Sequence, residues 1–291
     1  MILTYIVEKN KYETVNQVLK NEFKISSRLL HKLINSNQIF LNSNSIDTRS
    51  IVKENDVIVV DLDFVEESEN IISQKMDLNI IYEDDAILAI NKPAGIAIHP
   101  SILHYSDSLA NGVKYYLESI GLKRKIRPIN RLDLNTSGLV IFAKNEYVQE
   151  CLIQQMNKNI FKKEYLAIVD GIFDKDCGTI NLKIDRKENS IIKRCISENG
   201  QSAITHYKVI KALGTFSLVK CTLETGRTHQ IRLHMSAIGH PLLGDTLYGI
   251  ESDLINRQAL HSYKMNFIHP ITNKKVELFC DLPNDMKKVA Q

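Results

Sequence analysis

Apolar residues at helical spacing and short apolar runs give the first picture of the chain. In residues 1–60, two segments repeat apolar side chains at every third or fourth position, which predicts two amphipathic helices, the second capped by Ser26 and Ser27. The apolar positions are Val15, Val18 and Leu19 in the first segment and Leu29, Leu30, Leu33 and Ile34 in the second. Runs at 38–41 and 56–60 predict short strands. Residues 1–60 are therefore expected to form a small domain of mixed helix and strand.

Residues 77–291 contain more apolar runs, most of them short and rich in β-branched or aromatic residues, which favours strands. The expected strands are 80–82, 86–91, 138–143, 163–169, 205–211 and 217–223. Helical spacing with a capping residue is found in segments that begin at Asp107, at Asn145 and near Thr228. Their apolar positions are Leu109, Val113, Leu117 and Ile120; Val148, Leu152 and Met156; and Ile231, Met235 and Ile238. Many strands and few helices predict an α+β domain with a mixed, mostly antiparallel sheet.

Residues 61–76 differ from both neighbours in composition. They carry five acidic residues against one lysine and show no clear period, which is typical of an exposed linker. We therefore expect a domain over 1–60, an acidic linker over 61–76 and a larger domain over 77–291.

Charge and cysteine content narrow the class of protein. The 291 residues carry a formal net charge of +3, which is too small to indicate nucleic-acid binding by itself. Positive charge gathers locally, in Lys114, Lys123, Arg124, Lys125, Arg127 and Arg131 and again in Lys183, Arg186, Lys187, Lys193 and Arg194. No apolar run approaches the roughly 18 residues of a membrane span, and the start lacks a signal pattern, so a cytoplasmic protein without membrane contact is expected. Five widely spaced cysteines without a C-x-x-C pair argue against a disulfide framework or a zinc site.

The segment Arg131-Leu-Asp-Leu-Asn-Thr-Ser-Gly138 places one carboxylate, Asp133, on a polar turn directly before a predicted strand. A guanidinium two residues away would lower the pKa of this carboxylate and keep it charged, as a nucleophile requires. The same pattern also occurs as a structural ion pair, so the segment alone leaves both interpretations open.

Further motifs follow one another along the chain. They are Asn91-Lys-Pro-Ala-Gly-Ile-Ala-Ile-His-Pro100, Lys163-Glu-Tyr165, Leu223-Glu-Thr-Gly-Arg-Thr-His-Gln-Ile-Arg-Leu-His234, Gly239-His-Pro-Leu-Leu-Gly-Asp245 and Tyr248-Gly249. Together with the Asp133 segment, and in this order from about residue 77 to Pro283, they resemble the RluA/RluD-type pseudouridine synthases. Several ordered motifs are far more specific than any one of them.

The resemblance implies a pseudouridine synthase fold for residues 77–291 and a role for individual side chains. Asp133 would be the catalytic aspartate that drives cleavage of the base–ribose bond, Tyr165 would stack on uracil and assist proton removal, and Arg232 would pair with Asp133. Arg131, Arg227 and Lys163 would contact the RNA around a flipped-out nucleotide. The reaction is an isomerisation that conserves every atom, so no cofactor is expected.

The order of elements in residues 1–60 resembles the S4-type RNA-binding domain. That resemblance implies RNA contacts from Arg28, His31 and Lys32, with Arg49 and Lys53 nearby. Asparagines stand at the turns where the family usually has glycines, and few arginines line the second helix, so weak RNA affinity or a plain accessory domain is the alternative.

Other interpretations remain open at this stage. A base-releasing glycosidase would also use an Asp but normally needs a second carboxylate or a metal, and the nine histidines show no metal-binding motif. A non-catalytic RNA-binding or ribosome-assembly protein would keep the basic surfaces without the catalytic set.

Asn130 stands where many relatives have His, and it cannot take part in proton transfer. A monomer acting on RNA is expected, with large-subunit rRNA favoured over tRNA.

Overall fold

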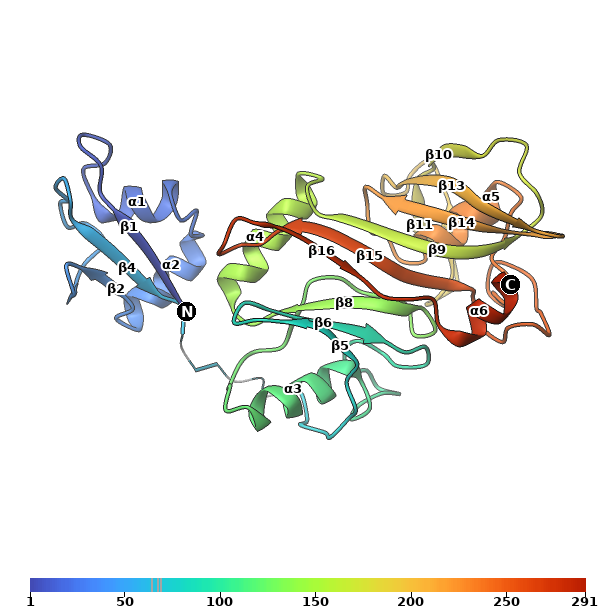
Figure 1. Cartoon of the computed structure of the whole chain (residues 1–291), viewed down its shortest axis with the longest axis horizontal. Helices are drawn as coiled ribbons and strands as arrows, with labels where there is room; N and C mark the ends of the chain where they lie inside the picture. Colours follow the sequence, from blue (N-terminus) through green and yellow to red (C-terminus); the bar gives the residue numbers. More distant parts are fainter. Residues whose placement is uncertain (64, 67, 69) are drawn as a thin grey trace.

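The computed structural model describes residues 1–63, 65–66, 68 and 70–291, which form a small amino-terminal domain beside a larger one (Figure 1). The small domain is a four-stranded sheet in the order β1-β4-β2-β3 with two helices. Its elements are β1 (Ile2–Ile6), α1 (Val15–Asn21), α2 (Ser27–Asn35), β2 (Ile39–Leu41), β3 (Asn44–Ser45) and β4 (Val57–Asp61). Both predicted helices and both predicted strands are confirmed within a residue or two, whereas β1 and β3 were not predicted.

Local capping explains where the two helices begin. The amide N–H of Gln17 donates to Thr14 Oγ1 at 3.4 Å, and Gln17 Oε1 accepts from the Thr14 N–H at 3.3 Å, which forms a capping box for α1. Ser26 Oγ accepts from the Leu29 N–H at 3.2 Å at the start of α2. The predicted apolar face of α2 is buried except at Ile34, which is 36% exposed in the last turn.

The large domain is built on a ten-stranded sheet with the order β10-β13-β14-β9-β15-β8-β6-β5. β16 pairs with β15, and β7 pairs with β8. The only parallel pair among these described strands is β15 with β8, so the predicted mixed, mostly antiparallel α+β fold is confirmed. The strands are β5 (Ile80–Glu83), β6 (Ile87–Lys92), β7 (Arg127–Pro128), β8 (Ser137–Ala143), β9 (Lys162–Asp170), β10 (Cys177–Asn181), β13 (Ile204–Leu213), β14 (Phe216–Leu223), β15 (Leu260–Ile268) and β16 (Lys275–Phe279).

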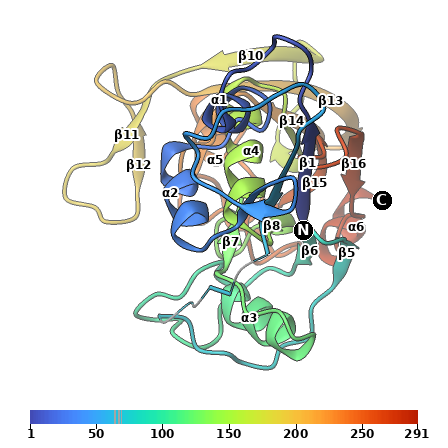
Figure 2. The same ribbon diagram turned by 90° about the vertical axis from the view of Figure 1, so that its left-hand side faces the viewer.

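Four helices and one hairpin complete this domain. The helices are α3 (Leu109–Ser119), α4 (Glu146–Asn157), α5 (Gln230–Ala237) and α6 (Asn284–Ala290). The hairpin of β11 (Ile184–Arg186) and β12 (Arg194–Ile196) projects from the body, and we call residues 184–196 the arm (Figure 2). The predicted cap of α3 at Asp107 is wrong by one residue, because Ser108 occupies the N-cap position with a buried hydroxyl group.

Several described residues of the predicted linker over 61–76 contact the large domain, while others are exposed. Glu66 accepts two hydrogen bonds of 2.6 Å from the guanidinium of Arg127, and Asp63 pairs with Arg124. Lys114 Nζ donates to the backbone oxygens of Ser68 and Ile71 at 3.1 and 2.7 Å. Asp63 and Glu66 neutralise part of the basic run before Asp133. Residues 64, 67 and 69 of this segment lie outside the described residues.

The two domains meet through charged side chains of α2 and α4. Lys32 Nζ pairs with Glu146, and Arg28 Nε lies 3.4 Å from the same carboxylate. Ser26 Oγ donates to Glu150 at 2.6 Å. Two of the three α2 residues predicted to bind RNA therefore contact the large domain, and Arg28 is exposed like His31.

Candidate active site

Asp133 lies on the turn between β7 and β8, at the wall of a cleft of about 900 Å³. Its backbone oxygen accepts from the Thr136 N–H at 3.0 Å, which closes the turn. The turn is followed by Gly138, whose φ is +113°. A Cβ at this position would lie 2.2 Å from the backbone oxygen of Ser262, so only glycine lets β8 approach β15 this closely. This close approach fixes where Asp133 emerges from the sheet.

A buried lysine anchors the same turn from the other side. Lys92 Nζ, with no exposed side-chain surface, donates to the backbone oxygens of Leu134 at 2.9 Å and of Pro93 and Ile96 at 2.8 Å each. Burial, helped by the charge of Arg257, lowers the pKa of Lys92 to about 7, and the charge of Asp133 opposes this. Three carbonyl acceptors also favour the ammonium form, because only that form has three hydrogens to donate.

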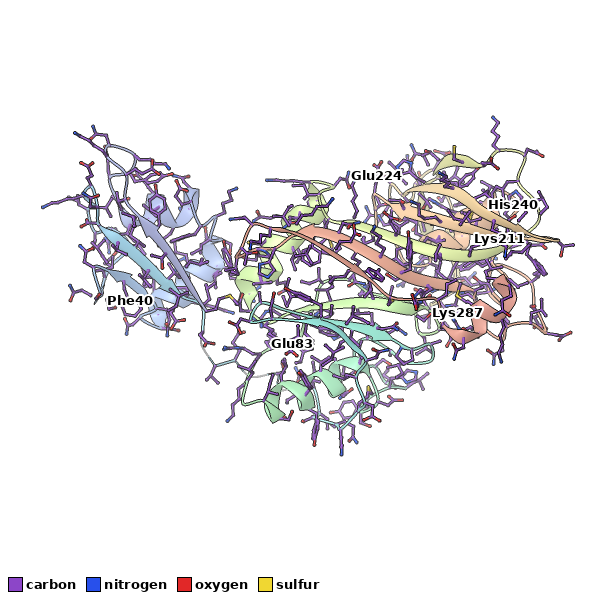
Figure 3. All side chains as sticks on the ribbon, viewed as in Figure 1. Phe40, Glu83, Lys211, Glu224, His240 and Lys287 are labelled. Carbon is purple, nitrogen blue, oxygen red and sulfur yellow. The ribbon has the colours of Figure 1, made fainter. Side chains whose placement is uncertain are left out.

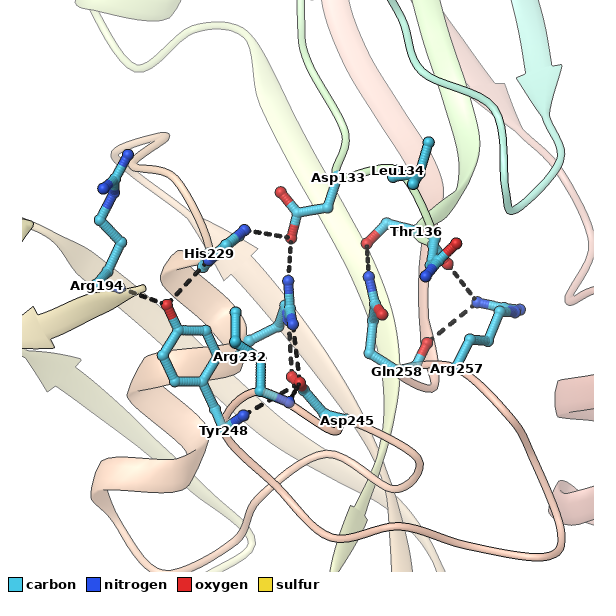
Figure 4. Close-up of polar contacts among 12 residues, drawn as sticks. Asp133, Leu134, Thr136, Arg194, His229, Arg232, Asp245, Tyr248, Arg257 and Gln258 are labelled. Carbon is cyan, nitrogen blue, oxygen red and sulfur yellow. Dashed lines mark hydrogen bonds and ion pairs between the residues drawn. The ribbon is translucent and has the colours of Figure 1, made fainter. Parts of the chain in front are cut away.

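Arg232 on α5 contacts Asp133, as the sequence predicts. Its Nη1 donates to Asp133 Oδ2 at 3.0 Å (Figure 4). Its other nitrogens hold the buried carboxylate of Asp245, with Nε–Oδ2 at 2.7 Å and Nη2–Oδ1 at 2.8 Å. The guanidinium lies 5.2 Å from the ring centroid of Tyr248. One cation is thus clamped between two carboxylates and an aromatic face, which leaves it little freedom to rotate.

The pKa values of Arg232 and Asp245 are set by two opposing effects, burial and the hydrogen bonds to charged partners. Burial alone would lower the pKa of Arg232, but its bonds to Asp245 and Asp133 raise it above the ordinary value. Burial alone would raise the pKa of Asp245, but the bonds from Arg232 and from the Leu247 and Tyr248 amides lower it. Arg232 and Asp245 are therefore both ionised at neutral pH. Asp245 is a site residue that the sequence reasoning missed, although it ends a motif already singled out.

Tyr165 on β9 is 5% exposed and lines the same cleft as Asp133. Its ring belongs to the core that contains Ala167, Val219 and Cys221, so it is both a packed side chain and part of the cleft wall. Burial raises the pKa of Tyr165, and the nearby charge of Asp133 acts in the same direction. The side chain is a neutral phenol at pH 7, and its ring supplies a flat apolar surface.

Cationic side chains surround the opening. Arg131, Arg227 and Lys163 all line the cleft, and Arg131 and Arg227 are exposed. The Nε of Arg227 donates to the Ser202 backbone oxygen at 3.0 Å, and burial lowers the pKa of Lys163. A neighbouring groove of about 300 Å³ continues from Arg131 and Arg227 to the base of the arm, and its lining includes Arg186 and Arg194.

Three further residues clarify earlier expectations. Asn130 is a structural residue: its Nδ2 donates to the Leu139 backbone oxygen and its Oδ1 accepts from the Ile141 N–H, both at 3.0 Å. His99 lines the cleft, and burial, with the charge of Arg131, lowers its pKa. Glu224, labelled in Figure 3, is a second carboxylate in the cleft lining that the sequence reasoning did not identify. Its Oε1 is held by His206 Nε2 at 2.7 Å.

Within the described ranges, no cluster of three or more His, Cys, Asp or Glu side chains could hold a metal ion. None of the described helices is both long and apolar enough to span a membrane.

Comparison with known proteins identifies the family. The RNA pseudouridylate synthase family model matches residues 86–237, which contain Asp133, Tyr165 and Arg232. RNA pseudouridine synthase YhcT of Bacillus subtilis (strain 168) is 41% identical over 98% of this chain and 95% of its own. The ribosomal large subunit pseudouridine synthase D of Zymomonas mobilis is 35% identical over 91% of this chain and 88% of its own. A solved structure, human RNA pseudouridylate synthase domain containing 1, aligns with a TM-score of 0.59 at 27% identity, over 70% of this chain and 83% of that one.

The chain belongs to the RNA pseudouridine synthase family. It is an RNA-modifying isomerase with the fold of this family.

Proposed function

We propose that the protein converts specific uridines of large-subunit rRNA to pseudouridine, with Asp133 as the nucleophile. The observation that carries this proposal is the arrangement of the cleft: a carboxylate bonded to a clamped arginine at 3.0 Å, beside a buried tyrosine and below exposed arginines. Arg232 donates a hydrogen bond to the Asp133 carboxylate, Tyr165 offers a face for the base, and the cations suit a phosphate backbone.

The chemistry balances without any added group. Asp133 forms a bond to ribose C1′ as the bond from C1′ to uracil N1 breaks, and the uracil leaves with the electron pair. The base turns within the cleft, C5 bonds to C1′, and the Asp133 carboxylate is released. The hydrogen on C5 is lost as a proton, and N1 gains one. Substrate and product have the same atoms, so neither water nor a cofactor is consumed.

Each surrounding side chain has a role in this scheme. The Tyr165 ring would hold the base by stacking while it turns, and the phenolic oxygen would assist removal of the C5 proton. Arg131, Arg227 and Lys163 would bind the phosphates that flank a nucleotide flipped out of its helix. We assign rRNA as the substrate because several relatives are named ribosomal large subunit pseudouridine synthase D.

The test maps pseudouridine in the RNA of cells with and without the gene and in RNA treated with pure protein. We expect specific uridines of large-subunit rRNA to depend on the protein, and Asp133→Asn to reduce the single-turnover rate by about 10⁴-fold or more. The exposed Asp174, changed to Asn, is the matched control. A tRNA target would overturn the substrate assignment, and RNA binding without any turnover would indicate a non-catalytic protein.

Glu224 gives a direct test against a base-releasing hydrolase. A glycosidase would need this second carboxylate to activate water, whereas the isomerisation does not. Glu224→Gln is therefore expected to change the rate of pseudouridine formation by less than about 3-fold. Accumulation of free uracil in the wild type, abolished by Glu224→Gln, would favour the hydrolase.

We further propose that residues 1–60 act as an S4-type RNA-binding domain and that the protein works as a monomer in the cytoplasm. The fold of two helices beside a small sheet supports the first point. Light scattering of the pure protein, with and without RNA, tests the second.

A further inference from the structure

His229, at the N-cap of α5, adopts a left-handed backbone conformation with φ of +59°. Most other described non-glycine residues with positive φ are asparagines, which tolerate this region well. A histidine there costs on the order of 1 kcal/mol and persists only where its surroundings determine it. The position of the side chain shows what those surroundings are.

The imidazole of His229 is held by Tyr248. Its Nδ1 lies 2.9 Å from the Tyr248 hydroxyl, and the two rings pack edge to face with centroids 5.5 Å apart. The backbone N–H of Arg194, the first residue of β12, donates to the same hydroxyl oxygen at 2.6 Å. That oxygen accepts from Arg194 and still carries its own proton, which in one of the two neutral tautomers of His229 is donated to Nδ1 (Figure 4). The hydrogen of a neutral ring then sits on Nε2.

Nε2 of His229 faces Asp133. It lies 3.9 Å from Oδ2, the oxygen that already accepts from Arg232 at 3.0 Å. This separation is about 1 Å too long for a hydrogen bond, and catalytic bonds often reach their final length only in the substrate complex. Both contacts drawn to Asp133 in Figure 4 end on this same oxygen. Two donors on Oδ2 would therefore leave Oδ1 as the oxygen presented to the cleft.

We propose that His229 is a positioning residue for Asp133: its Nε2–H closes onto Oδ2 when RNA binds, and Tyr248 fixes the tautomer that allows it. The inference rests on the proposed function, since it assigns to His229 the orientation of the proposed nucleophile. It also connects the arm to the site. The Arg194 backbone N–H donates to the Tyr248 hydroxyl, and this hydroxyl contacts the imidazole of His229.

The protonation state of the ring agrees with this role. Burial lowers the pKa of His229, the charge of Asp133 opposes this, and the charge of Arg232 adds to it; Asp245 and Arg194 contribute smaller effects of opposite sign. The ring is therefore neutral at pH 7. It becomes charged only at a pH below the ordinary pKa of histidine. Protonation would put a hydrogen on Nδ1, where the Tyr248 proton already lies, and would disturb the arrangement.

The experiment compares two substitutions of His229 that differ in reach. His229→Asn keeps the left-handed backbone, but its amide is too short to reach Asp133; the longer amide of His229→Gln extends to about where Nε2 lies and can donate. We expect the single-turnover rate of His229→Asn to fall about 100-fold, RNA affinity to stay within about 3-fold, and His229→Gln to recover part of the loss. Tyr248→Phe removes the hydroxyl that contacts Nδ1 of His229, so either neutral tautomer of His229 becomes possible. We expect it to lower the rate less than His229→Asn does.

The dependence of the rate on pH separates positioning from a plain structural role. In the wild type, the rate should fall on the acidic side as His229 is protonated, and in His229→Asn that part of the fall should disappear. A His229→Asn rate within about 2-fold of wild type, or a loss of rate that His229→Gln does not recover, would overturn the inference. A wild type without any pseudouridine formation would instead overturn the proposed function.

Discussion

At the scale of single residues, the main feature of the site is that its side chains are held in fixed positions by their neighbours. Asp133 keeps one carboxylate oxygen bonded to Arg232, and Arg232 is itself held by Asp245. Arg232 and Asp245 form a buried pair, so the guanidinium stays compensated when Asp133 loses its charge by forming a bond to ribose. Variants of the two residues beside Asp133 test these assignments separately.

Replacing Tyr165 with Phe removes the hydroxyl and keeps the ring. Because the ring is 5% exposed and packed in the core, the fold and the stacking surface should persist. We expect RNA affinity within about 3-fold of wild type and a single-turnover rate lowered by about 100-fold or more, since general acid–base assistance is lost. Loss of affinity with an unchanged rate would make Tyr165 a binding residue.

Replacing Arg232 with Lys keeps the positive charge but removes the guanidinium group, which holds both oxygens of Asp245. An ammonium group cannot reach Asp133 and both oxygens of Asp245 in the observed geometry. We expect the rate to fall by roughly 100-fold and the melting temperature to fall, because Asp245 loses a bidentate partner while it stays buried. The exposed Arg227, changed to Lys, is the control; equal effects of the two changes would contradict the assignment.

The residues that sequence reasoning found and missed differ in a simple way. Asp133, Tyr165 and Arg232 stand in motifs that resemble a known family, and the direction of Arg232 away from Ile231 and Met235 follows from helix geometry. The partnership of Asp245 with Arg232, and of His229 with Tyr248, depends on how α5 packs against the loop after it. The spacing of residues along the chain does not indicate which of these side chains contact each other.

At the scale of elements, most helix caps and apolar runs were predictable, and β15, whose core-facing side is partly polar, was not. Asn145 caps α4 as expected, and β8 is buried along its whole length. β15 escaped prediction because His261, Ser262 and Lys264 interrupt its apolar pattern, although His261 and Ser262 are fully buried. Ser137 Oγ lies 2.9 Å from His261 Nδ1, so a polar contact between strands replaces the apolar pattern that prediction requires.

Lys92, at the end of β6, allows a test of how β6 supports the catalytic turn. Its pKa is about 7 when folded against about 10.5 when unfolded, so between these values the unfolded chain binds more protons and stability should rise with pH. Relative to Lys92→Met, the wild-type free energy of unfolding should rise between pH 7 and pH 10 with a slope of up to about 1.4 kcal/mol per unit. Denaturant titrations across this range measure the difference. Equal slopes would mean that the three carbonyls keep the lysine charged.

At the scale of the whole molecule, the segment between the domains contacts the large one through Asp63, Glu66 and Met76. Composition predicts that residues 77–291 fold alone, but Glu66 bonds Arg127, and Met76 packs against α3. We expect residues 63–291 to melt about 5 °C higher than residues 77–291, because the shorter form loses this pairing and apolar burial. Equal melting temperatures would mean that the segment adds nothing to stability.

The longer truncated protein also tests the role of the amino-terminal domain. Residues 63–291 retain the whole cleft, so activity on a short stem-loop should stay within about 3-fold of the full-length rate. Activity on natural RNA should fall, and its dependence on salt should weaken as phosphate contacts from α2 are lost. Unchanged rates and salt dependence on both substrates would show that residues 1–60 do not target RNA.

The order of strands also determines when the enzyme can first act during its own synthesis. β15 lies in the middle of the large sheet, between β9 and β8, yet it is among the last strands to leave the ribosome. Until it emerges, β5, β6 and β8 on one side and β9, β14, β13 and β10 on the other have no strand to join them. Asp133 and Tyr165 stand on opposite sides of that junction. A nascent chain therefore cannot bring Asp133 and Tyr165 together in one cleft until β15 is made.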